Sequence, residues 1–492
     1  MWRRSASIAN WRRSPTAATL FQPPVSGRHG DLSPITDRLA GIRSLGLNRA
    51  VPRTDASANI RRENAPLSSV SSVSAWTWIP TLYLAEGLPN VIVAAVSVVV
   101  YKNLGVSNAD IAFYTSWLYL PWVLKPLWSP VVDLVKTRRV WIWTTQLLIG
   151  CACAGVGFGL VSSYFFPATL ALFAVLAFVS ATHDIAADGF YLLALPVRFQ
   201  ALYVGVRNSF YRIAMICGQG GLVALAGWLS LRTAGPATAW MVSFGLVSAL
   251  FLCLSLYHGL VLPRPAGDQP GTESKGHLSI GDFAATIGSF FQKPRLFASL
   301  SFLLFYRFGE AQLVKMVQPF LLDPRAAGGL GLTNEQLGLV YGTLGVAALL
   351  AGGLVGGWVV SRRGLLSWLW PMACAIHLPD AMFLYLAWFR PNSLAVTAAC
   401  VGVEQFGYGF GFTAYMLYMM HIARGAHQTA HYAICTGFMA MGLMFPGMCS
   451  GWLQQHLGYP IFFLWVMFAT IPGFAVTALA ARELKRSTVE EC

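Results

Sequence analysis

Long apolar runs alternate with short polar segments from about residue 76 to residue 481. Since a helix needs about 20 apolar residues to cross a bilayer, each run predicts one transmembrane helix. The pattern therefore predicts an all-α, multi-pass membrane protein. Its twelve predicted helices cover residues 76–100, 109–133, 140–162, 167–195, 203–228, 236–261, 296–321, 335–361, 365–389, 394–421, 430–454 and 459–481.

The twelve predicted helices form two halves that repeat one another. A shift of 224 residues lays Glu86 on Glu310, and a shift of 220 residues lays Asp184 on Glu404. Two pseudo-symmetric six-helix halves in the same orientation would produce such matches. The predicted parts are an N-terminal segment 1–75, a first half 76–262, a Pro- and Gly-rich cytoplasmic linker 263–295, a second half 296–481 and a tail 482–492.

The composition agrees with a membrane protein. Hydrophobic residues make up 56% of the chain and charged residues 11%, whereas soluble domains carry about 25% charged residues. The net charge is +14, and fourteen Lys and Arg lie in loops and tail on one predicted side of the membrane against four on the other. Since cytoplasmic loops carry this excess, both termini are predicted to be cytoplasmic. The same rule explains the charge without nucleic acid as a partner.

The first 75 residues differ from the rest of the chain. They hold eleven arginines, four acidic residues and no lysine. They lack an apolar stretch long enough for a signal peptide, and their Arg-, Ser- and Pro-rich composition predicts disorder. Three origins fit this segment: a transit peptide, a cytoplasmic tail, or a translation start placed too far upstream.

Eleven charged residues lie within the predicted helices and away from their ends. Left unpaired in lipid, at roughly 3 kcal/mol each, they would cost on the order of 30 kcal/mol. They are therefore expected to face one another or a water-filled cavity. The five cations and six acids are Lys125, Arg207, Arg212, Arg307 and Lys315, and Glu86, Asp184, Asp188, Glu310, Asp380 and Glu404.

Two acids of the fourth predicted helix are the strongest candidates for function. Asp184 and Asp188 lie four residues apart and share one helical face, and intramembrane acids are functional-site candidates by default. Arg207 and Arg212 of the fifth predicted helix are five residues apart. They do not share a face, so at most one of them is expected to pair with an aspartate of the fourth helix.

Two further acids have different local settings. Glu86 has no charged residue within one turn of its own helix, so it is expected to be protonated, paired across helices or open to the cavity. Arg307 and Glu310 are three residues apart and can meet along one face. A locked structural pair and a role toward the substrate both fit them.

A basic cluster follows the second predicted helix. Asp133 precedes Arg138 and Arg139, and an aspartate capping a helix and arginines at helix C-termini are both favourable. With Lys125 of the same helix, these residues are a candidate conformational latch. Lys125 can equally extend toward the cytoplasmic face, and topology alone would account for the arginines.

Histidines beside aspartates raise the question of a metal site. His183 precedes Asp184, and His377 lies three residues before Asp380. No CxxC, HExxH or comparable spacing accompanies them, so neither a metal nor another cofactor is predicted. The sequence also lacks the nucleophile set of an enzyme.

Glycines recur at helical spacing in the second half. They pair four residues apart at Gly352/Gly356 and Gly353/Gly357. Small residues at this spacing predict close helix contact or bending. The same prediction applies to three glycines after Glu404, namely Gly407, Gly409 and Gly411.

Several motifs of the first half form a recognisable set. They are AEGLPN at 85–90, GVSNADIAFYTSWLYLPWVLKPLWSPVVD at 105–133, KTRR at 136–139 and SATHDIAADGF at 180–190. This set resembles AmpG-type muropeptide permeases and the related acetyl-coenzyme A transporters of the major facilitator superfamily, whose fold has two six-helix halves. The family pattern has glutamine where this chain has His183, and often a neutral residue at Glu86.

The resemblance implies a proton-driven transporter of the bacterial cytoplasmic membrane, working by alternating access of its halves. We expect a monomer whose partners are protons, the lipid bilayer and a sugar- or peptidoglycan-derived solute such as a muropeptide. An acetyl-coenzyme A or other organic-anion transporter, and a sensor that binds without translocating, are alternatives. The candidate substrate and proton-coupling residues are Glu86, Asp184, Asp188, Arg207, Arg212, Arg307, Glu310 and Glu404.

Overall fold

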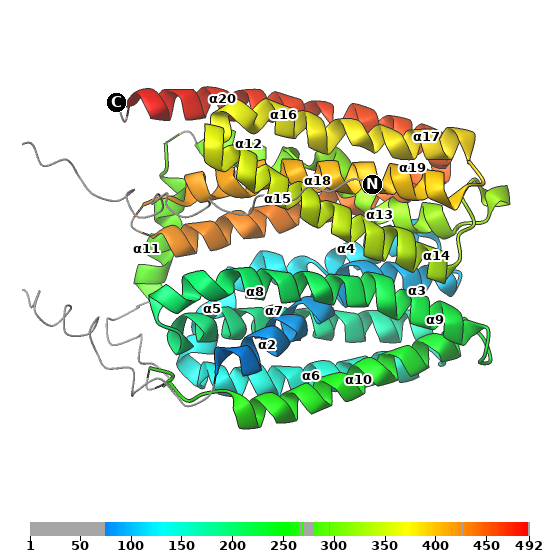
Figure 1. The fold of residues 1–492 in the computed structure, drawn as a ribbon, viewed down its shortest axis with the longest axis horizontal. Helices are drawn as coiled ribbons and strands as arrows, with labels where there is room; N and C mark the ends of the chain where they lie inside the picture. Colours follow the sequence, from blue (N-terminus) through cyan, green and yellow to red (C-terminus); the bar gives the residue numbers. More distant parts are fainter. Residues whose placement is uncertain (1–73, 266, 270–279, 295, 426, 491–492) are drawn as a thin grey trace, which may run out of the picture. The chain divides into compact units, whose positions relative to one another are not determined.

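The computed structural model describes residues 74–265, 267–269, 280–294, 296–425 and 427–490. These residues belong to the unit Val70–Cys492, and their regular structure is entirely helical (Figure 1). The prediction of disorder for the N-terminal segment falls on residues outside this description, apart from Ser74 and Ala75.

The first half consists of six helical spans, three of which change helix type or are interrupted. π-helical turns lie within the first and fifth spans, and a two-residue break at Leu118 and Tyr119 divides the second. The helices are α2 (Ala75–Val91), η2 (Ile92–Val96) and α3 (Ser97–Asn103); α4 (Asn108–Trp117) and α5 (Leu120–Val135); α6 (Arg138–Gly159); α7 (Phe165–Ala194); α8 (Val197–Met215), η3 (Ile216–Leu222) and α9 (Val223–Ser230); and α10 (Pro236–Val261).

The second half repeats this plan after a linker helix, α11 (Ile280–Phe291). Its last two spans are joined through Gly458, whose φ of 72° turns the chain sharply inside α19. The helices are α12 (Leu296–Phe305) and α13 (Phe308–Leu322); η5 (Arg325–Ala327); α14 (Asn334–Leu337), η6 (Gly338–Gly345) and α15 (Val346–Arg363); α16 (Leu365–His377), η7 (Leu378–Asp380) and α17 (Ala381–Phe389); α18 (Leu394–Ala423); α19 (Gln428–Ala469); and α20 (Ile471–Glu490).

Eight helical ranges among the described residues are long and apolar enough to cross a membrane. One of them, Ala430–Arg486, contains the turn at Gly458 and so holds two spans. Three more spans fall outside this set: α4 with α5 and α12 with α13 are interrupted, and α18 carries Glu404 and Gln405 near its middle. The described helices therefore supply the twelve spans that the sequence predicts.

The structure differs from the predicted helices mainly at their ends. α8 begins at Val197, six residues before the predicted start, and α20 continues to Glu490 through most of the predicted tail. The predicted linker is not simply a loop, because it contains α11. These differences arise because amphipathic or charged helical segments do not register as apolar runs.

The glycine prediction is confirmed where α15 meets α18. A Cβ atom on Gly352 would lie 2.0 Å from the backbone oxygen of Phe406, and one on Gly356 would lie 2.7 Å from the hydroxyl of Thr413. Only glycine allows the two backbones this close. At Gly357 a Cβ atom would meet nothing within 4 Å, so only one of the two glycine pairs makes the contact.

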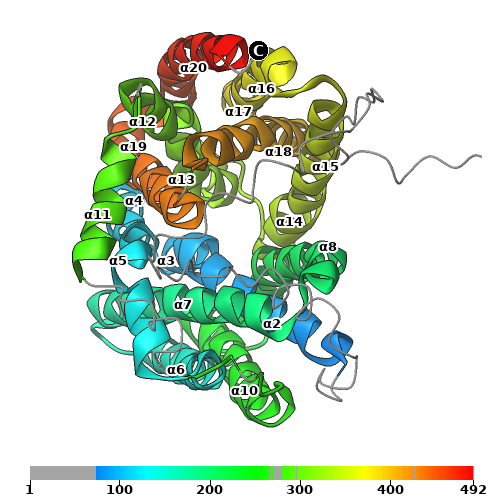
Figure 2. The ribbon, with the colours of Figure 1, turned by 90° about the vertical axis from the view of Figure 1, so that its left-hand side faces the viewer.

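Helices of the two halves meet along two lines. α4 and α5 pack against α19, and η3 and α9 pack against η6 and α14. Figure 2 shows α15 to α20 in the upper part of the view and α6, α7, α8 and α10 in the lower part. Where η3 crosses η6 the contact is backbone to backbone: a Cβ atom on Gly342 would lie 2.3 Å from the carbonyl carbon of Gln219, and one on Gly338 would lie 2.6 Å from the oxygen of Gly220.

The spans run between two ends of this unit. α11 and the end of α20 lie at one end, and the α13–α14 connection lies at the other (Figure 1). We call the first the α11 end. The second is the Lys102 end, after the residue at the end of α3.

Candidate functional site

Asp184, in the middle of α7, is held by two residues of α5. Its Oδ2 atom lies 3.6 Å from Lys125 Nζ and accepts a hydrogen bond of 3.1 Å from Trp122 Nε1. Its Oδ1 atom is buried and has no hydrogen-bond partner among the residues that the structure describes. Lys125 therefore turns inward to an acid of its own half. Trp122 is a site residue that the sequence did not reveal, since an indole in an apolar run reads as packing.

Asp188, one turn along α7, binds a different cation. Arg207 of α8 approaches its Oδ1 atom to 2.7 Å, and the Tyr83 hydroxyl of α2 donates to the same atom at 3.4 Å. The guanidinium of Arg207 also lies 4.6 Å from the centre of the Tyr83 ring and 5.7 Å from that of Tyr191. This pair is more open than the first, because 40% of the Asp188 side chain is exposed.

Of the two arginines on α8, only Arg207 pairs with the fourth span. The guanidinium of Arg212 donates to the sulfur of Met215 at 3.3 Å. Among the described residues Arg212 has no ion-pair partner. It is a half-buried cation available to an anionic group.

Glu86 lies within α2, with 6% of the residue exposed. Its Oε2 atom is buried and has no hydrogen-bond partner among the described residues. Pairing across helices, one of the three expectations for this residue, is therefore absent at that oxygen. A buried carboxylate in this state is stable only with a proton, a water contact or a ligand.

His183 belongs to a polar chain that the sequence did not reveal. Its Nε2 atom lies 3.0 Å from Gln146 Nε2, Gln146 Oε1 lies 2.9 Å from His258 Nδ1, and His258 Nε2 lies 2.9 Å from Thr81 Oγ1. The four residues come from α7, α6, α10 and α2. This chain ties four helices of the first half together.

In the second half, Arg307 and Glu310 do not pair with each other. The prediction of a locked structural pair is therefore wrong. Arg307 donates to the Tyr408 hydroxyl and lies 5.0 Å from the ring centres of Tyr408 and Phe412. Among the described residues it forms no ion pair with Glu310. The two side chains part because Arg307 lies in the break between α12 and α13, where the helical spacing does not apply.

Glu310 is instead one of three acids that the fold gathers. Glu310 of α13, Asp380 of η7 and Glu404 of α18 place carboxylate oxygens within 4.8 Å of one another. All three are buried. We call this group the acid triad. Asp380 was noted as an intramembrane acid, but no spacing along the chain indicated that it would join Glu310 and Glu404.

Lys315 crosses from one half to the other. It lies on α13, where its Nζ atom donates to Thr115 Oγ1 of α4 at 3.0 Å and lies 4.9 Å from the centre of the Tyr119 ring. Only 3% of the residue is exposed. It therefore connects the halves near the middle of the spans.

The residues of the candidate latch contact their own half and the linker. The backbone N–H groups of Arg138 and Arg139 donate to the Asp268 carboxylate at 2.7 and 3.1 Å. The cap expected from an aspartate thus comes from the linker, while the side chain of Asp133 lies outside the description. Arg139 Nε donates to the Leu262 oxygen, at the end of α10, at 3.1 Å. The role of a latch stays a prediction.

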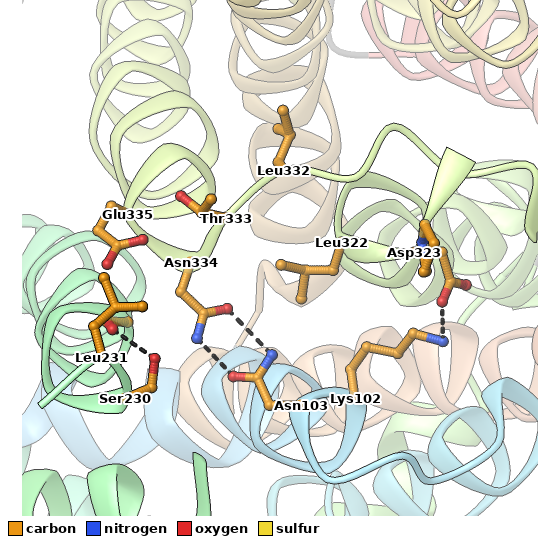
Figure 3. Close-up of a pocket in the computed structure, with 12 residues that line it drawn as sticks. Lys102, Asn103, Ser230, Leu231, Leu322, Asp323, Leu332, Thr333, Asn334 and Glu335 are labelled. Atoms are coloured by element: carbon orange, nitrogen blue, oxygen red, sulfur yellow. Dashed lines mark hydrogen bonds and ion pairs between the residues drawn. The ribbon is translucent and has the colours of Figure 1, made fainter. Parts of the chain in front are cut away.

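A polar network joins the halves at the Lys102 end (Figure 3). Lys102 Nζ lies 2.5 Å from Asp323 Oδ1, and the Tyr459 hydroxyl donates to Asp323 Oδ2 at 2.6 Å. Asn103 and Asn334 exchange two hydrogen bonds, of 3.2 and 2.7 Å. These contacts connect the two halves at the Lys102 end.

A cavity of ≈ 360 Å³ lies beside this network, between α9 and the α13–α14 connection. Lys102, Asn103 and Asp323 line it together with Thr333 and Glu335. In the sequence, Lys102 is one of the four Lys and Arg on the less basic predicted side of the membrane, and no pattern indicates a role for Asp323. Asp323 lies two residues after the predicted end of a span, and this position is the one signal that could have revealed it.

Comparisons with known proteins agree with this architecture. The model of the Major Facilitator Superfamily matches residues 81–438. The chain is 26% identical over 418 residues to the anhydromuropeptide permease of Escherichia coli K12, covering 83% of this chain and 80% of the permease. It is 24% identical over 414 residues to the putative transporter AmpG 4 of Rickettsia conorii, covering 80% and 94%.

Solved structures resemble the fold. A bacterial homologue of the human lysosomal transporter Spinster, in an inward-facing and unoccupied conformation, matches with a TM-score of 0.62 at 17% identity, covering 82% of this chain and 95% of that one. A D-xylose-proton symporter matches with a TM-score of 0.57 at 13% identity and the same coverage. The predicted arrangement of two six-helix halves is thereby confirmed.

Proposed function

Because this chain belongs to the major facilitator superfamily, we propose that it is a proton-coupled secondary transporter of a sugar- or peptidoglycan-derived solute of the muropeptide kind. The two halves carry the solute by alternating access around a site near the bilayer midplane. Similarity to an anhydromuropeptide permease over 83% of this chain supports the class of solute.

The single observation that carries proton coupling is the state of Asp184. One oxygen is shared with Lys125 at 3.6 Å and with Trp122, while the other is buried without a partner. A buried carboxylate needs a cation or a proton. Moving Lys125 away during the transport cycle would leave the proton as the remaining partner. Asp184 is therefore the residue proposed to take up and release the transported proton.

Asp188, Arg207, Glu86 and Arg212 are proposed to line the solute path in the first half. Arg207 and Tyr83 hold Asp188 at the more exposed of the two ion pairs. Arg212 has no acid partner among the described residues, so it can bind an anionic group of the solute. The same feature favours the alternative of an acetyl-coenzyme A or other organic-anion transporter.

The orientation follows from the distribution of Lys and Arg. With both termini cytoplasmic, the α11 end faces the cytoplasm and the Lys102 end faces the opposite side. Closure at the Lys102 end then corresponds to an inward-facing state. We place the protein in a bacterial cytoplasmic membrane, as a monomer that is neither an enzyme nor a nucleic-acid-binding protein.

Uptake into proteoliposomes tests this function. A labelled anhydro-muropeptide should enter faster when the outside is more acidic than the inside. Asp184→Asn should abolish acceleration by the pH gradient while exchange of labelled for unlabelled solute continues, because exchange needs no net proton movement. Asp110→Asn is the matched control, since Asp110 is exposed and bonds only to Ser107 of its own helix cap.

Three results would contradict the proposal. Uptake that ignores the pH gradient, with Asp184→Asn still active, removes proton coupling. Uptake of acetyl-coenzyme A but not of muropeptide changes the class of solute. Binding of muropeptide without exchange identifies a sensor that does not translocate.

A further inference from the structure

The acid triad is assembled from three separate elements of the second half. Glu310, Asp380 and Glu404 lie in α13, η7 and α18, and their carboxylate oxygens come within 4.8 Å of one another. The exposed fractions of the three residues are 0%, 1% and 2%. Acids that gather on a protein surface are common, but three acids at full burial are not.

The oxygens of two triad members have no partner. Both carboxylate oxygens of Glu310 and both of Asp380 are buried without a hydrogen bond among the described residues. Glu404 accepts one hydrogen bond, from Gln405 Nε2 at 3.0 Å. Buried polar atoms in folded proteins are nearly always paired. Unpaired oxygens of two acids in one buried group therefore indicate a place for a positively charged or hydrogen-bond-donating partner.

The cations nearest along the chain do not fill this place. Arg307 is bound to Tyr408, and Lys315 extends to Thr115 of the other half. His377, one turn from Asp380, packs its ring against Tyr306 and Phe474. Among the described residues, no ion pair to any of the three acids is therefore present.

The spacing of the three carboxylate oxygens is compatible with one bound ion. A point between three atoms that are all within 4.8 Å of one another lies no more than about 2.8 Å from each, and calcium–oxygen distances are about 2.3–2.6 Å. Sodium has nearly the same ionic radius as calcium. Carboxylates are the ligands that hard cations of this kind prefer.

We propose that Glu310, Asp380 and Glu404 form a binding site for one hard cation of the size of sodium or calcium. Each acid contributes one carboxylate oxygen, and the ion supplies the partner that the oxygens of Glu310 and Asp380 lack. Since the three ligands lie in three separate elements, the ion connects α13, η7 and α18. This binding is a property of the second half and does not depend on the solute or on the direction of transport.

Direct ion binding to the purified full-length protein tests the site. In sodium- and calcium-free buffer at alkaline pH, radioactive sodium or calcium is added in separate arms, with potassium and magnesium as competitors that differ in size. One of the two arms should show saturable binding of one ion per chain. Because only the folded state binds, that ion should also raise the unfolding temperature by roughly 2–5 °C near saturation.

The triad variants Glu310→Gln, Asp380→Asn and Glu404→Gln should each weaken binding at least tenfold. The control is Asp110→Asn, because Asp110 is an exposed acid of the other half that bonds to Ser107 of its own helix cap. It should keep the affinity of the unmodified protein. If the triad variants do not fold, ion binding to the unmodified protein at different pH values still tests the site. Protons compete with the ion for the carboxylates, so the apparent affinity for the ion should fall in acid.

Two outcomes overturn the proposal. Absence of saturable binding of either ion to the unmodified protein means that the acids hold protons instead. Unchanged ion binding in all three triad variants means that the ion lies elsewhere.

Discussion

Replacing Asp323 by asparagine should loosen the contact between the halves at the Lys102 end. The substitution keeps the size of the side chain and one acceptor oxygen, but it removes the charge that faces Lys102 Nζ at 2.5 Å. Lys102 would retain the amide oxygen of Asn108 at 2.8 Å. The Tyr459 hydroxyl, which donates to Asp323 at 2.6 Å, could still find an oxygen. The perturbation is therefore largely the loss of one ion pair.

The magnitude follows from how far the pair is buried. The exposed fractions of the two side chains are 16% and 12%, and breaking a fully buried pair by removing one partner costs about 3–5 kcal/mol. Here the remaining lysine keeps a hydrogen bond and borders a cavity of ≈ 360 Å³. The loss should thus be nearer that of a hydrogen bond between charged groups, about 1.5–3 kcal/mol. This range shifts the ratio of closed to open states by roughly 10–100-fold.

Distances between two spin labels provide the assay. Cysteines at Ser163 in the α6–α7 loop and Ala326 in η5 place one label on each half, at exposed positions of the Lys102 end. The exposed native cysteines Cys151, Cys217, Cys253 and Cys449 would first be replaced by serine. Asp323→Asn should add or enlarge a population with a longer distance, and exchanging the charges of Lys102 and Asp323 should partly restore the short one.

The control is Asp110→Asn, the same chemical change at an exposed residue of this end that bonds within its own half. An unchanged distance distribution in Asp323→Asn would refute the idea that this ion pair closes the end. An equal shift of the distance distribution in the control variant would mean that loss of any negative charge at this end, rather than loss of this ion pair, changes the distance.

Three further predictions concern packing and the charged interior. Gly352→Ala should lower the free energy of unfolding by about 1–3 kcal/mol, because its Cβ atom would lie 2.0 Å from a backbone oxygen. Gly357→Ala should leave the free energy of unfolding unchanged. Thermal unfolding measures both variants, and equal effects would contradict the close contact. A double-mutant cycle between Arg207 and Asp188 should give a coupling of about 0.5–1.5 kcal/mol in stability, and additive losses would contradict the pair. Trp122→Phe removes the hydrogen bond to Asp184 and should slow gradient-driven uptake about tenfold; an uptake rate equal to that of the unmodified protein would exclude Trp122 from the site.

The positions of the spans could be predicted because a bilayer imposes a length on every apolar run. Runs such as Phe165–Ala194 could therefore be recognised as spans from their length. The acids inside them could be recognised because the neighbouring residues are apolar. α11 was missed because an amphipathic helix beside a membrane protein has no such length signal. The charged site was predicted by residue type, while its pairings depended on side-chain directions that helical spacing alone does not give.

The acid triad shows most clearly which contacts could not be predicted from the sequence. Glu310, Asp380 and Glu404 are separated by 70 and 24 positions in the sequence, and only the packing of α13, η7 and α18 brings them together. Spacing suggested Arg307 as the partner of Glu310, but the break after α12 redirects that arginine to Tyr408. Likewise, Lys102 and Asp323 each ended a span, and nothing in either segment indicated that they would face each other.

The crossing of η3 and η6 has a mechanical consequence. Gly220 and Gly338 meet there through backbone atoms, and Gly342 lies directly on the backbone at Gln219. Interlocking side chains at a helix crossing would resist rotation of one helix against the other. A crossing formed by backbone atoms of glycines allows such rotation while the helices stay in contact. A larger residue at Gly338 or Gly342 would therefore push η3 and η6 apart, so the distance between the two halves at this crossing is set by glycine.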